Sequence, residues 1–194
     1  MGVQKSKAVI KKEIIDYLNA TSGQIDPRPG KHSCGIKHRN ALVLATSYKD
    51  VPRATALEFF NEGLTIYIFG EPGKKIANIK RNSKVSAFIY DHTDHSKLQK
   101  CLQIFAEAEL ITMRNNPRLF KAKIKKWALD AAAKKMASSY VKAQKMSAEE
   151  AENLIKKGIE ALTLIKVIPH HIILKEKHPN FFTRTYEWKK QTKA

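Results

Sequence analysis

The middle of the chain contains four short hydrophobic segments with the lengths and periods of β-strands. The first is a continuous apolar run that ends in the turn residues Tyr48-Lys49-Asp50, a pattern typical of a strand buried on both faces. The third is rich in β-branched and aromatic side chains, and the fourth alternates apolar with polar positions. We therefore predict consecutive strands over residues 41–47, 53–60, 64–69 and 84–90.

Turn residues separate these strands. Gly63 stands near the left-handed position of a short hairpin turn that joins the second strand to the third. Gly70-Glu71-Pro72-Gly73 ends the third strand. Ile76 and Ile79 then lie three residues apart, which predicts a short helix that begins at Lys74 and buries one face.

Helical patterns and further strands flank this segment. Apolar residues recur four apart after Ser6, a suitable N-cap, and predict an amphipathic first helix. Strand patterns return over residues 97–112 and 162–174, the latter with a bend at Pro169-His170-His171. The aromatic segment 181–188 is expected to pack, with a partner subunit as one candidate surface. The apolar positions of the first helix are Ile10, Ile14 and Leu18, and those of the strand 97–112 are Leu102, Ile104, Ala106 and Ala108.

Residues 115–161 are predicted to form a helical insertion before the closing strand. Pro117 marks the start of one helix, and Ser147 with Glu150 forms a capping box for a second. We interpret these helices as a cover packed on the strands or across a dimer, with a membrane-surface helix as the alternative; Trp127 is then a core residue. The predicted apolar sides are Phe120, Ile124, Trp127 and Ala131 in the first helix and Ala151, Leu154, Ile155 and Ile159 in the second.

Length and composition indicate one cytoplasmic domain. A chain of 194 residues with 43% hydrophobic residues suits a single folded unit, residues 1–194, with core strands at about 40–112 and 162–176 and the insertion at about 115–161. No apolar run approaches the roughly 20 residues that span a bilayer, so no membrane partner is expected. Cys34 and Cys101 form no Cys-x-x-Cys pair, which fits a reducing compartment.

The formal net charge of +18 favours anionic partners. The basic residues are spread over nearly every segment, and the chain contains no helix-turn-helix, zinc-finger or RRM-type motif. We therefore treat nucleic-acid binding as the minor hypothesis and a basic surface that serves small anions as the main one. No P-loop and no Gly-x-Gly-x-x-Gly motif is present either.

Two polar segments contain residues that could ligate a metal. His32, Cys34 and His38 lie on a Pro- and Gly-rich loop, and the turn 91–96 carries two aspartates and two histidines. Neither set has the spacing of a known zinc motif, and successive turn residues point in several directions. We interpret both as ordinary loop residues and predict no metal site.

The ordered pattern of strands and turns resembles the FMN-binding split-barrel family, which includes the pyridoxamine 5'-phosphate oxidases. The resemblance covers about residues 40–112. A later strand, residues 102–110, resembles the family's strand that ends in Gly-x-Ala, with Ala106 in place of the Gly. The motifs that carry it are Leu44-Ala45-Thr46, Pro52-Arg53-Ala54-Thr55, Tyr67-Ile68-Phe69, Lys74-Lys75-Ile76-Ala77-Asn78-Ile79 and Asn82-Ser83-Lys84-Val85.

The resemblance implies a mainly β (α+β) fold: a split β-barrel with an N-terminal helix and a helical insertion before the closing strand. It implies FMN as cofactor and a homodimer in which two subunits share each site. Its phosphate ligands would be Arg53, Thr55, Lys74 and Lys75, while the backbone of Ala54, Thr55, Ala56 and Leu57 and of Phe69 and Gly70 would edge the isoalloxazine ring. No catalytic residue is assigned, because the flavin carries the redox chemistry.

The placement of the cations gives an argument of its own for a phosphate. If the strands around Gly63 pair along their whole length, Arg53 and Lys75 approach each other and repel unless an anion lies between them. Two exposed cations at strand ends are the alternative interpretation, and residue spacing alone does not decide between the two.

Three functional hypotheses follow. The first is an FMN-dependent oxidoreductase with a small-molecule electron donor and acceptor that the sequence does not identify. The second is a non-catalytic protein of the same fold that binds flavin, haem or deazaflavin, with His170-His171 and His38 available for haem ligation. The third is a binder of nucleic acid or another polyanion. The Arg-x-His segment of pyridoxamine 5'-phosphate oxidase itself is not reproduced at Arg184-Thr185-Tyr186, which speaks against that specific activity.

Overall fold

The computed structural model describes residues 5–22, 41–90, 98–131, 138, 141, 146–179 and 182–191. The loops expected over residues 24–39 and 91–96, with their histidines and Cys34, lie outside these residues. The fold is one antiparallel sheet with helices around it, and the sheet order is β2-β1-β5-β6-β7-β4-β3, with β8 also paired to β7. The strands are β1 (Ala41–Tyr48), β2 (Val51–Glu58), β3 (Phe60–Glu62), β4 (Thr65–Gly70), β5 (Lys84–Tyr90), β6 (Gln99–Ile111), β7 (Thr163–Lys177) and β8 (Thr183–Lys189).

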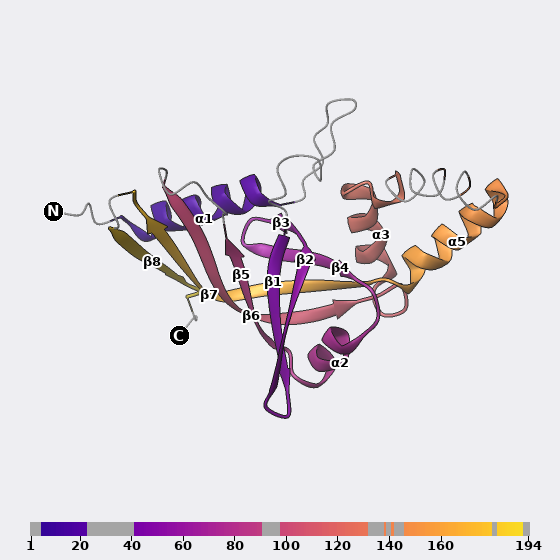
Figure 1. Cartoon of the computed structure of the whole chain (residues 1–194), viewed down its shortest axis with the longest axis horizontal. Coiled ribbons are helices and arrows are strands. Elements are labelled where there is room, and N and C mark those ends of the chain that lie inside the picture. Colours follow the sequence, from indigo (N-terminus) through magenta and orange to yellow (C-terminus); the bar gives the residue numbers. More distant parts are fainter. Residues whose placement is uncertain are drawn as a thin grey trace.

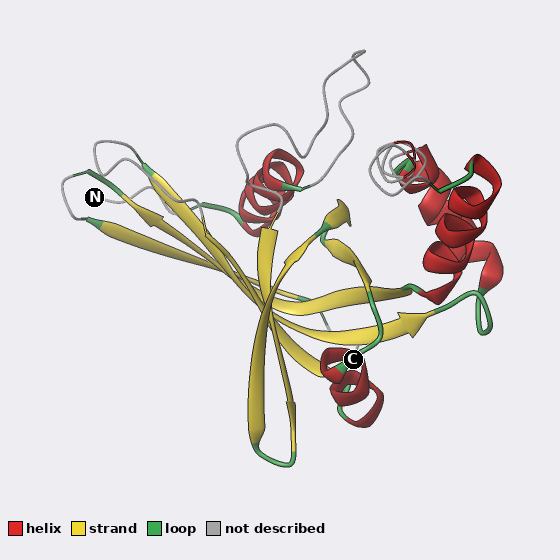
Figure 2. Cartoon of the chain, turned by 45° about the vertical axis from the view of Figure 1, so that its right-hand side comes forward, coloured by secondary structure: helices red, strands yellow, loops and turns green. Residues whose placement is uncertain are grey.

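The sheet curls into a half-barrel, so that its two ends come near each other (Figure 1; Figure 2). Among the described strands, β2 pairs only with β1 and β3 only with β4, so each is the last of these strands at its end of the sheet. Residues of β2 and β4 approach each other without a hydrogen-bonded register. The half-barrel is therefore split along a line where β2 faces β4.

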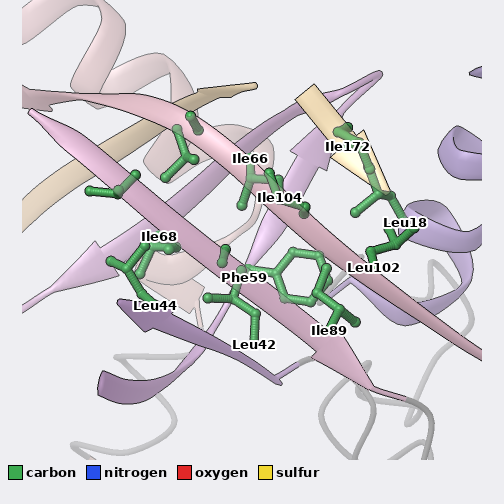
Figure 3. Packing of buried hydrophobic residues seen from close by; sticks show 14 of the residues in the cluster. Leu18, Leu42, Leu44, Phe59, Ile66, Ile68, Ile89, Leu102, Ile104 and Ile172 are labelled. Carbon is green, nitrogen blue, oxygen red and sulfur yellow. The ribbon is translucent and has the colours of Figure 1, made fainter. Parts of the chain in front are cut away.

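The core fills the concave side of this sheet. The inward positions of β1, β5 and β6 are buried, as the alternating pattern predicted for the last two. α1 (Lys7–Thr21), capped by Ser6 as expected, adds its buried face to the same core. Figure 3 shows side chains from the sheet and from α1 meeting there; the labelled ones are Leu18, Leu42, Leu44, Phe59, Ile66, Ile68, Ile89, Leu102, Ile104 and Ile172.

The prediction that the first strand is buried on both faces was wrong. Leu42 and Leu44 are buried, whereas Val43 between them is 40% exposed. Its cross-strand neighbour Phe88 on β5 is 41% exposed, so the convex face of the sheet is apolar here. A continuous apolar run thus marks a strand whose outer face has no cover among the described residues.

The second predicted strand is interrupted at Phe59. Up to Glu58 the chain pairs with β1, and from Phe60 it pairs with β4. The side chain of Phe59 is fully buried at this corner, which explains why the hydrophobic run continues through the break. Gly63 adopts φ +58° in the turn that follows, the left-handed conformation that was predicted.

β7 is one continuous strand of 15 residues, and the predicted bend is a β-bulge. Phe105 is opposite His171 and Ala106 is opposite Pro169, so His170 is the extra residue on β7. The first part of β7 pairs with β4 and the last part with β8. The aromatic C-terminal segment therefore packs on its own chain, with Tyr186 and Trp188 against the core, and needs no partner subunit for this.

The remaining helices lie at two places around the sheet. α2 (Lys74–Arg81) lies beside β1, while α3 (Pro117–Lys126) and α5 (Ala148–Ala161) lie at the opposite end of the long axis from α1 and β8 (Figure 1). Phe120, Ile124 and Trp127 are buried as predicted, but Ala131 is exposed because α3 ends at Lys126 and the chain turns at Ala128. The capping box of α5 is present.

The apolar side predicted for α5 is only partly buried. Ala151 is buried, Ile155 and Ile159 are half-buried, and Leu154 is 52% exposed. The amphipathic pattern located the helix correctly but did not say how much of its apolar side the neighbouring elements cover. In the part of the chain that the structure describes, no helix is long and apolar enough to cross a membrane.

Candidate functional site

α2 is fastened to the end of β1 by three side-chain contacts. Asn78 Nδ2 donates to Thr46 Oγ1 at 3.2 Å, and Asn82 Nδ2 donates to the Ser47 carbonyl at 3.0 Å. The guanidinium of Arg81 lies 4.9 Å from the centre of the Tyr48 ring. Thr46 is 3% exposed, so these contacts hold a buried hydroxyl as well as the helix. The position of α2 relative to the β1–β2 hairpin is therefore fixed.

This arrangement gathers the predicted phosphate ligands around one contact. Arg53 on β2 is the cross-strand partner of Thr46 on β1. Lys74 and Lys75 begin α2 and precede Asn78 by one helical turn, about 5 Å along the axis. The expected cations thus lie on both sides of the Thr46–Asn78 hydrogen bond.

The cations at this place have little compensation. Within the described residues, the side chains of Arg53 and Lys74 make no hydrogen bond and no ion pair. The first turn of α2 contains no acidic residue, and its N-cap, Gly73, has no side chain to bond the free backbone amides. A helix N-terminus with unbonded amides and adjacent basic side chains is a ready site for a phosphate.

Lys75 folds back over the end of β4. Its Nζ donates to the Glu71 carbonyl at 3.2 Å, and its Cε would lie 2.9 Å from a Cβ placed on Gly70. Gly70 is thus a position where a side chain would displace Lys75. The glycine predicted to edge the flavin ring thus lies in contact with a predicted phosphate ligand.

The hairpin argument for the contact between Arg53 and Lys75 was wrong in its premise. The second and third predicted strands pair only from Phe60 to Glu62, and β2 and β4 lie in different parts of the sheet order. The cause is the corner at Phe59, which the hydrophobic pattern did not reveal. Arg53 and α2 are related through β1 instead.

The predicted ring-binding residues line the split of the barrel. Ala54 and Ala56 are exposed, Thr55 and Leu57 are half-buried, and all four belong to β2, whose outer edge has no partner strand among the described residues. In an edge strand, alternate backbone N–H and C=O groups point away from the partner strand and need other partners. The backbone groups on the outer edge of β2 are therefore available to bond a ligand.

Phe69, the other predicted ring contact, turns its side chain away from the main core. Its ring lies 6.1 Å from that of Phe120 and 6.2 Å from that of Trp127, both at edge-to-face angles. Phe60 stacks on Trp127 at 4.7 Å and completes the cluster. The backbone of β4 at Phe69 therefore lies at the split, while the Phe69 side chain packs against the helical insertion.

The sequence analysis missed a charged group next to this aromatic cluster. Glu62 on β3 accepts hydrogen bonds from Lys123 and Lys126 of α3. Lys123 is 8% exposed, and its Nζ lies 4.6 Å from the centre of the Tyr67 ring. The sequence analysis assigned no role to Lys123, and its partner Glu62 is 61 residues away, so no local pattern joins the two.

The charges of this group shift two pKa values. Partial burial alone would raise the pKa of Glu62, but the hydrogen bonds and charges of Lys123 and Lys126 outweigh it and lower the pKa to about 2. Burial, followed by the adjacent Glu62 carboxylate, raises the pKa of Tyr67 to about 12. At neutral pH the group contains a carboxylate and a neutral phenol.

The described part of the chain contains no cluster of three or more metal-ligating side chains. His171, named as a haem ligand in the alternative hypothesis, bonds Glu187 Oε2 through Nε2 at 3.1 Å and stacks on Phe105. His32, Cys34 and His38 lie outside the described residues, so their prediction as ordinary loop residues stays a prediction.

A curled antiparallel sheet with two facing, unpaired edges is a split barrel. The chain belongs to the pyridoxamine 5'-phosphate oxidase family, whose model matches residues 29–155, more than half of the chain. This match begins before and ends after the segment in which the resemblance was found. No curated protein matches the chain.

Two solved structures with TM-scores of 0.50 or more share the fold at low sequence identity. PhzG from Burkholderia lata 383, in complex with tetrahydrophenazine-1-carboxylic acid, is 14% identical, with a TM-score of 0.53, and covers 78% of this chain and 77% of its own. A conserved hypothetical protein from Mycobacterium tuberculosis is 15% identical, with a TM-score of 0.50 and coverages of 96% and 86%. An FAD-binding protein from Mesorhizobium loti is 17% identical, with a TM-score of 0.48 and coverages of 71% and 84%.

Proposed function

We propose that this protein is an FMN-dependent oxidoreductase that binds its flavin in the split between β2 and β4 and acts on a small-molecule donor and acceptor. The observation that carries the proposal is a set of basic side chains that have no acidic partner among the described residues. Lys74 and Lys75 begin α2, whose N-cap makes no side-chain bond, and Arg53 lies opposite Thr46, the residue that Asn78 of α2 contacts. Membership in the pyridoxamine 5'-phosphate oxidase family supports it.

The residues at the split fit an FMN molecule. The phosphate would bind Arg53, Thr55, Lys74 and Lys75, and replace the bond of the Lys75 ammonium to the Glu71 carbonyl. Arginine and lysine together provide a bidentate fork and a point charge for a dianion. A bound flavin supplies the hydride chemistry, while the chain positions it and sets the electrostatic environment. Positive charge at one end of the split would also favour anionic substrates.

The ring would lie along the free edge of β2. Backbone groups of Ala54, Ala56 and their neighbours would bond its polar edge, and the backbone of Phe69 and Gly70 would limit it on the side of β4. Because Phe69 is held by Phe120 and Trp127, this backbone is fixed before the flavin binds. Preorganisation of this kind lowers the entropy cost of binding.

A second subunit would cover the convex face of the sheet. Val43, Phe88 and Tyr90 are 40%, 41% and 52% exposed, and the rings of Phe88 and Tyr90 stack at 6.2 Å. Val43 and Phe88 are cross-strand neighbours on β1 and β5, so the three side chains form one apolar surface. Exposed apolar surfaces that cross several elements are typical of protein interfaces. We assign the homodimer interface to this surface.

Absorption spectra of the purified protein and of the flavin released by heat test the cofactor. We expect flavin bands and FMN, not FAD, at about one per chain, since a dianionic monophosphate fits a cluster of terminal cations. The variant Arg53→Ala/Lys75→Ala should lose flavin retention and remain folded. The control Lys80→Ala/Lys84→Ala removes the same charge from exposed residues near the site and should retain it. Full flavin in the first variant would refute the assigned site.

The oligomeric state tests the interface. Phe88→Glu should give a monomer in sedimentation experiments, and Leu154→Glu, an equally exposed apolar position on α5, should stay dimeric. If two subunits share each flavin, the monomeric variant should also lose flavin although Arg53 and Lys75 are intact. A dimer that persists in Phe88→Glu would overturn the assigned interface but leave the phosphate site standing.

A further inference from the structure

A second cationic cleft lies between α1 and β8, on elements that do not contribute to the proposed flavin site. It has a volume of about 480 Å³, within the range of small-molecule sites. Four lysines line it together with a single acid, Glu187. The lining residues are Lys7, Ala8 and Lys11 of α1 and Glu187, Trp188, Lys189, Lys190 and Gln191 of the C-terminal segment.

The charge of this cleft is not balanced by its own residues. Glu187 already accepts from Lys189 at 2.9 Å and bonds His171 at 3.1 Å. In the part of the chain that the structure describes, the ammonium groups of Lys7, Lys11 and Lys190 have no ion pair and no hydrogen bond. Three uncompensated cations thus face one cleft, and each raises the free energy of the others.

Neighbouring lysines show that pairing is available in this region. Lys5 bonds Glu13 at 2.7 Å and lies 3.4 Å from Glu176, and Lys12 bonds Asp16 at 2.7 Å. Glu13, Glu176 and Asp16 pair with lysines that do not line the cleft. Glu187 pairs with one lysine of the cleft, Lys189. Of the four lysines that line the cleft, only Lys189 has an acidic partner among the described residues.

A cleft at the other end of the molecule provides a comparison. The groove between α3 and α5, of about 800 Å³, is lined by three lysines and by three acids, Asp130, Glu152 and Glu160. Its charges balance, whereas the cleft between α1 and β8 has four cations and one anion. Electrostatics alone therefore favours an anion in the cleft between α1 and β8 but not in the groove between α3 and α5.

Trp188 adds an aromatic surface to these charges. It lines the cleft and is packed against the core from the other side, so its orientation is fixed. A fixed indole next to several ammonium groups suits a ligand that has a planar ring and phosphates, because the ring stacks on the indole and lysines bind phosphate as point charges.

We propose that the cleft between α1 and β8 binds nucleoside phosphates. The ligand is either a free nucleotide or a residue of a single-stranded nucleic acid; both present a base for Trp188 and phosphate for Lys7 and Lys11. This inference does not depend on the proposed flavin site, which is formed by β1, β2, β4 and α2.

The test measures the binding of two probes to the flavin-loaded protein at 50 mM and 200 mM salt. ADP is followed by equilibrium dialysis, and a labelled ten-residue oligoadenylate by fluorescence anisotropy. We expect saturable binding of ADP at one per chain. Tighter binding of the oligonucleotide, with a steeper salt dependence, would assign the site to a strand; equal affinity per nucleotide would assign it to the free nucleotide.

Lys7→Gln/Lys11→Gln should weaken binding by about tenfold or more and lower the salt slope for the oligonucleotide by about two. Lys121→Gln/Lys125→Gln removes two helical lysines with the same spacing from the charge-balanced groove and should change affinity less than twofold. Both double variants should keep their flavin, so the outcome is separate from that of the Arg53 experiment.

Three results would overturn the proposal. Equal weakening by the two double variants would show a general effect of net charge. Inorganic tripolyphosphate that binds as tightly as ADP would show that the indole takes no part. Absence of binding of both probes at 50 mM salt would exclude the site.

Discussion

Two groups of cations in this protein have opposite surroundings. Lys123 and Lys126 share Glu62, and Lys123 is buried against Tyr67 and Trp127. Arg53 and Lys74 lie exposed beside α2 and have no acidic partner among the described residues. The first group fastens the helical insertion to the sheet, and the second is available to a ligand. Pairing and burial, not residue type, separate a structural cation from a binding one.

This comparison predicts different responses to mutation. Loss of a residue in the Glu62 group should reduce the stability of the protein, because it leaves a cavity or an unpaired charge at the junction of α3 and β4. Loss of a cation in the Arg53 group should leave the stability of the flavin-free protein unchanged and alter only ligand binding. The predictions below follow from the largest expected effect to the smallest.

Trp127→Ala should have the largest effect. The indole is 5% exposed and contacts the rings of Phe60, Tyr67 and Phe69, so its removal should cost about 3–5 kcal/mol of unfolding free energy. Denaturant titration measures this value. Leu154→Ala, at an exposed position of α5, should cost less than about 0.5 kcal/mol. Equal losses in both variants would mean that the aromatic cluster does not fasten the insertion.

Glu62→Gln should cost about 2 kcal/mol. The change leaves the buried ammonium of Lys123 without its counter-charge, and the side chain of Glu62 is only 29% exposed. Glu71→Gln, at an exposed loop position without an ion pair in the described residues, is the matched control and should be neutral. If Glu62→Met is as stable as the wild type, the ion pair between Glu62 and Lys123 adds no stability beyond that of the packing of an apolar side chain at position 62.

The free energy of unfolding should depend on pH through the ionisation of Glu62 and Tyr67. The pKa of Glu62 is lowered to about 2 in the folded protein, so its contribution is present above its unfolded pKa near 4.5 and is lost as the pH falls towards 2. The pKa of Tyr67 is raised to about 12, so its contribution is present below its unfolded pKa near 10 and is lost between pH 10 and 12.

Urea titrations of the wild type and of Glu62→Gln across both ranges measure these contributions. In the variant, the loss of stability below pH 4.5 should be smaller by about 1–2 kcal/mol. Parallel curves for the two proteins would show that other carboxylates cause the acid transition.

Arg53→Ala should have the smallest effect on stability, within about 0.5 kcal/mol in the flavin-free protein, because the side chain is exposed and unpaired. With FMN added at about 100 times its Kd, the wild type should gain about 2.7 kcal/mol, and the variant should lose most of this gain. A large destabilisation of the flavin-free variant would mean that Arg53 stabilises the fold and is not only a ligand-binding residue.

Much of the fold follows from local pattern. The alternation in residues 84–90 and 102–108, the caps at Ser6 and Ser147 and the glycine at position 63 were predicted from the sequence and are present in the structure. Each depends on contacts between residues close in sequence or on the period of one element. The fold class followed from the order of these elements.

What the sequence did not reveal depends on contacts between distant elements. Phe59 lies in one unbroken hydrophobic run, and only the change of partner from β1 to β4 makes it a corner. The burial of Lys123 requires Glu62, which is 61 residues away. Similarly, the family resemblance named the candidate phosphate ligands, but the position of α2 relative to β1 is set by packing and by the bond between Asn78 and Thr46, 32 residues apart.

The pairing of β4 with β7 has a consequence for the order of folding during synthesis. The hairpin β3–β4 is complete when Gly70 has left the ribosome, but its pairing edge waits for Thr163–Val167, almost a hundred residues later. At typical rates of about 5–20 residues per second, an open strand edge persists for roughly 5–20 seconds. During this time the β4 edge that later pairs with β7 is open to pairing with other chains.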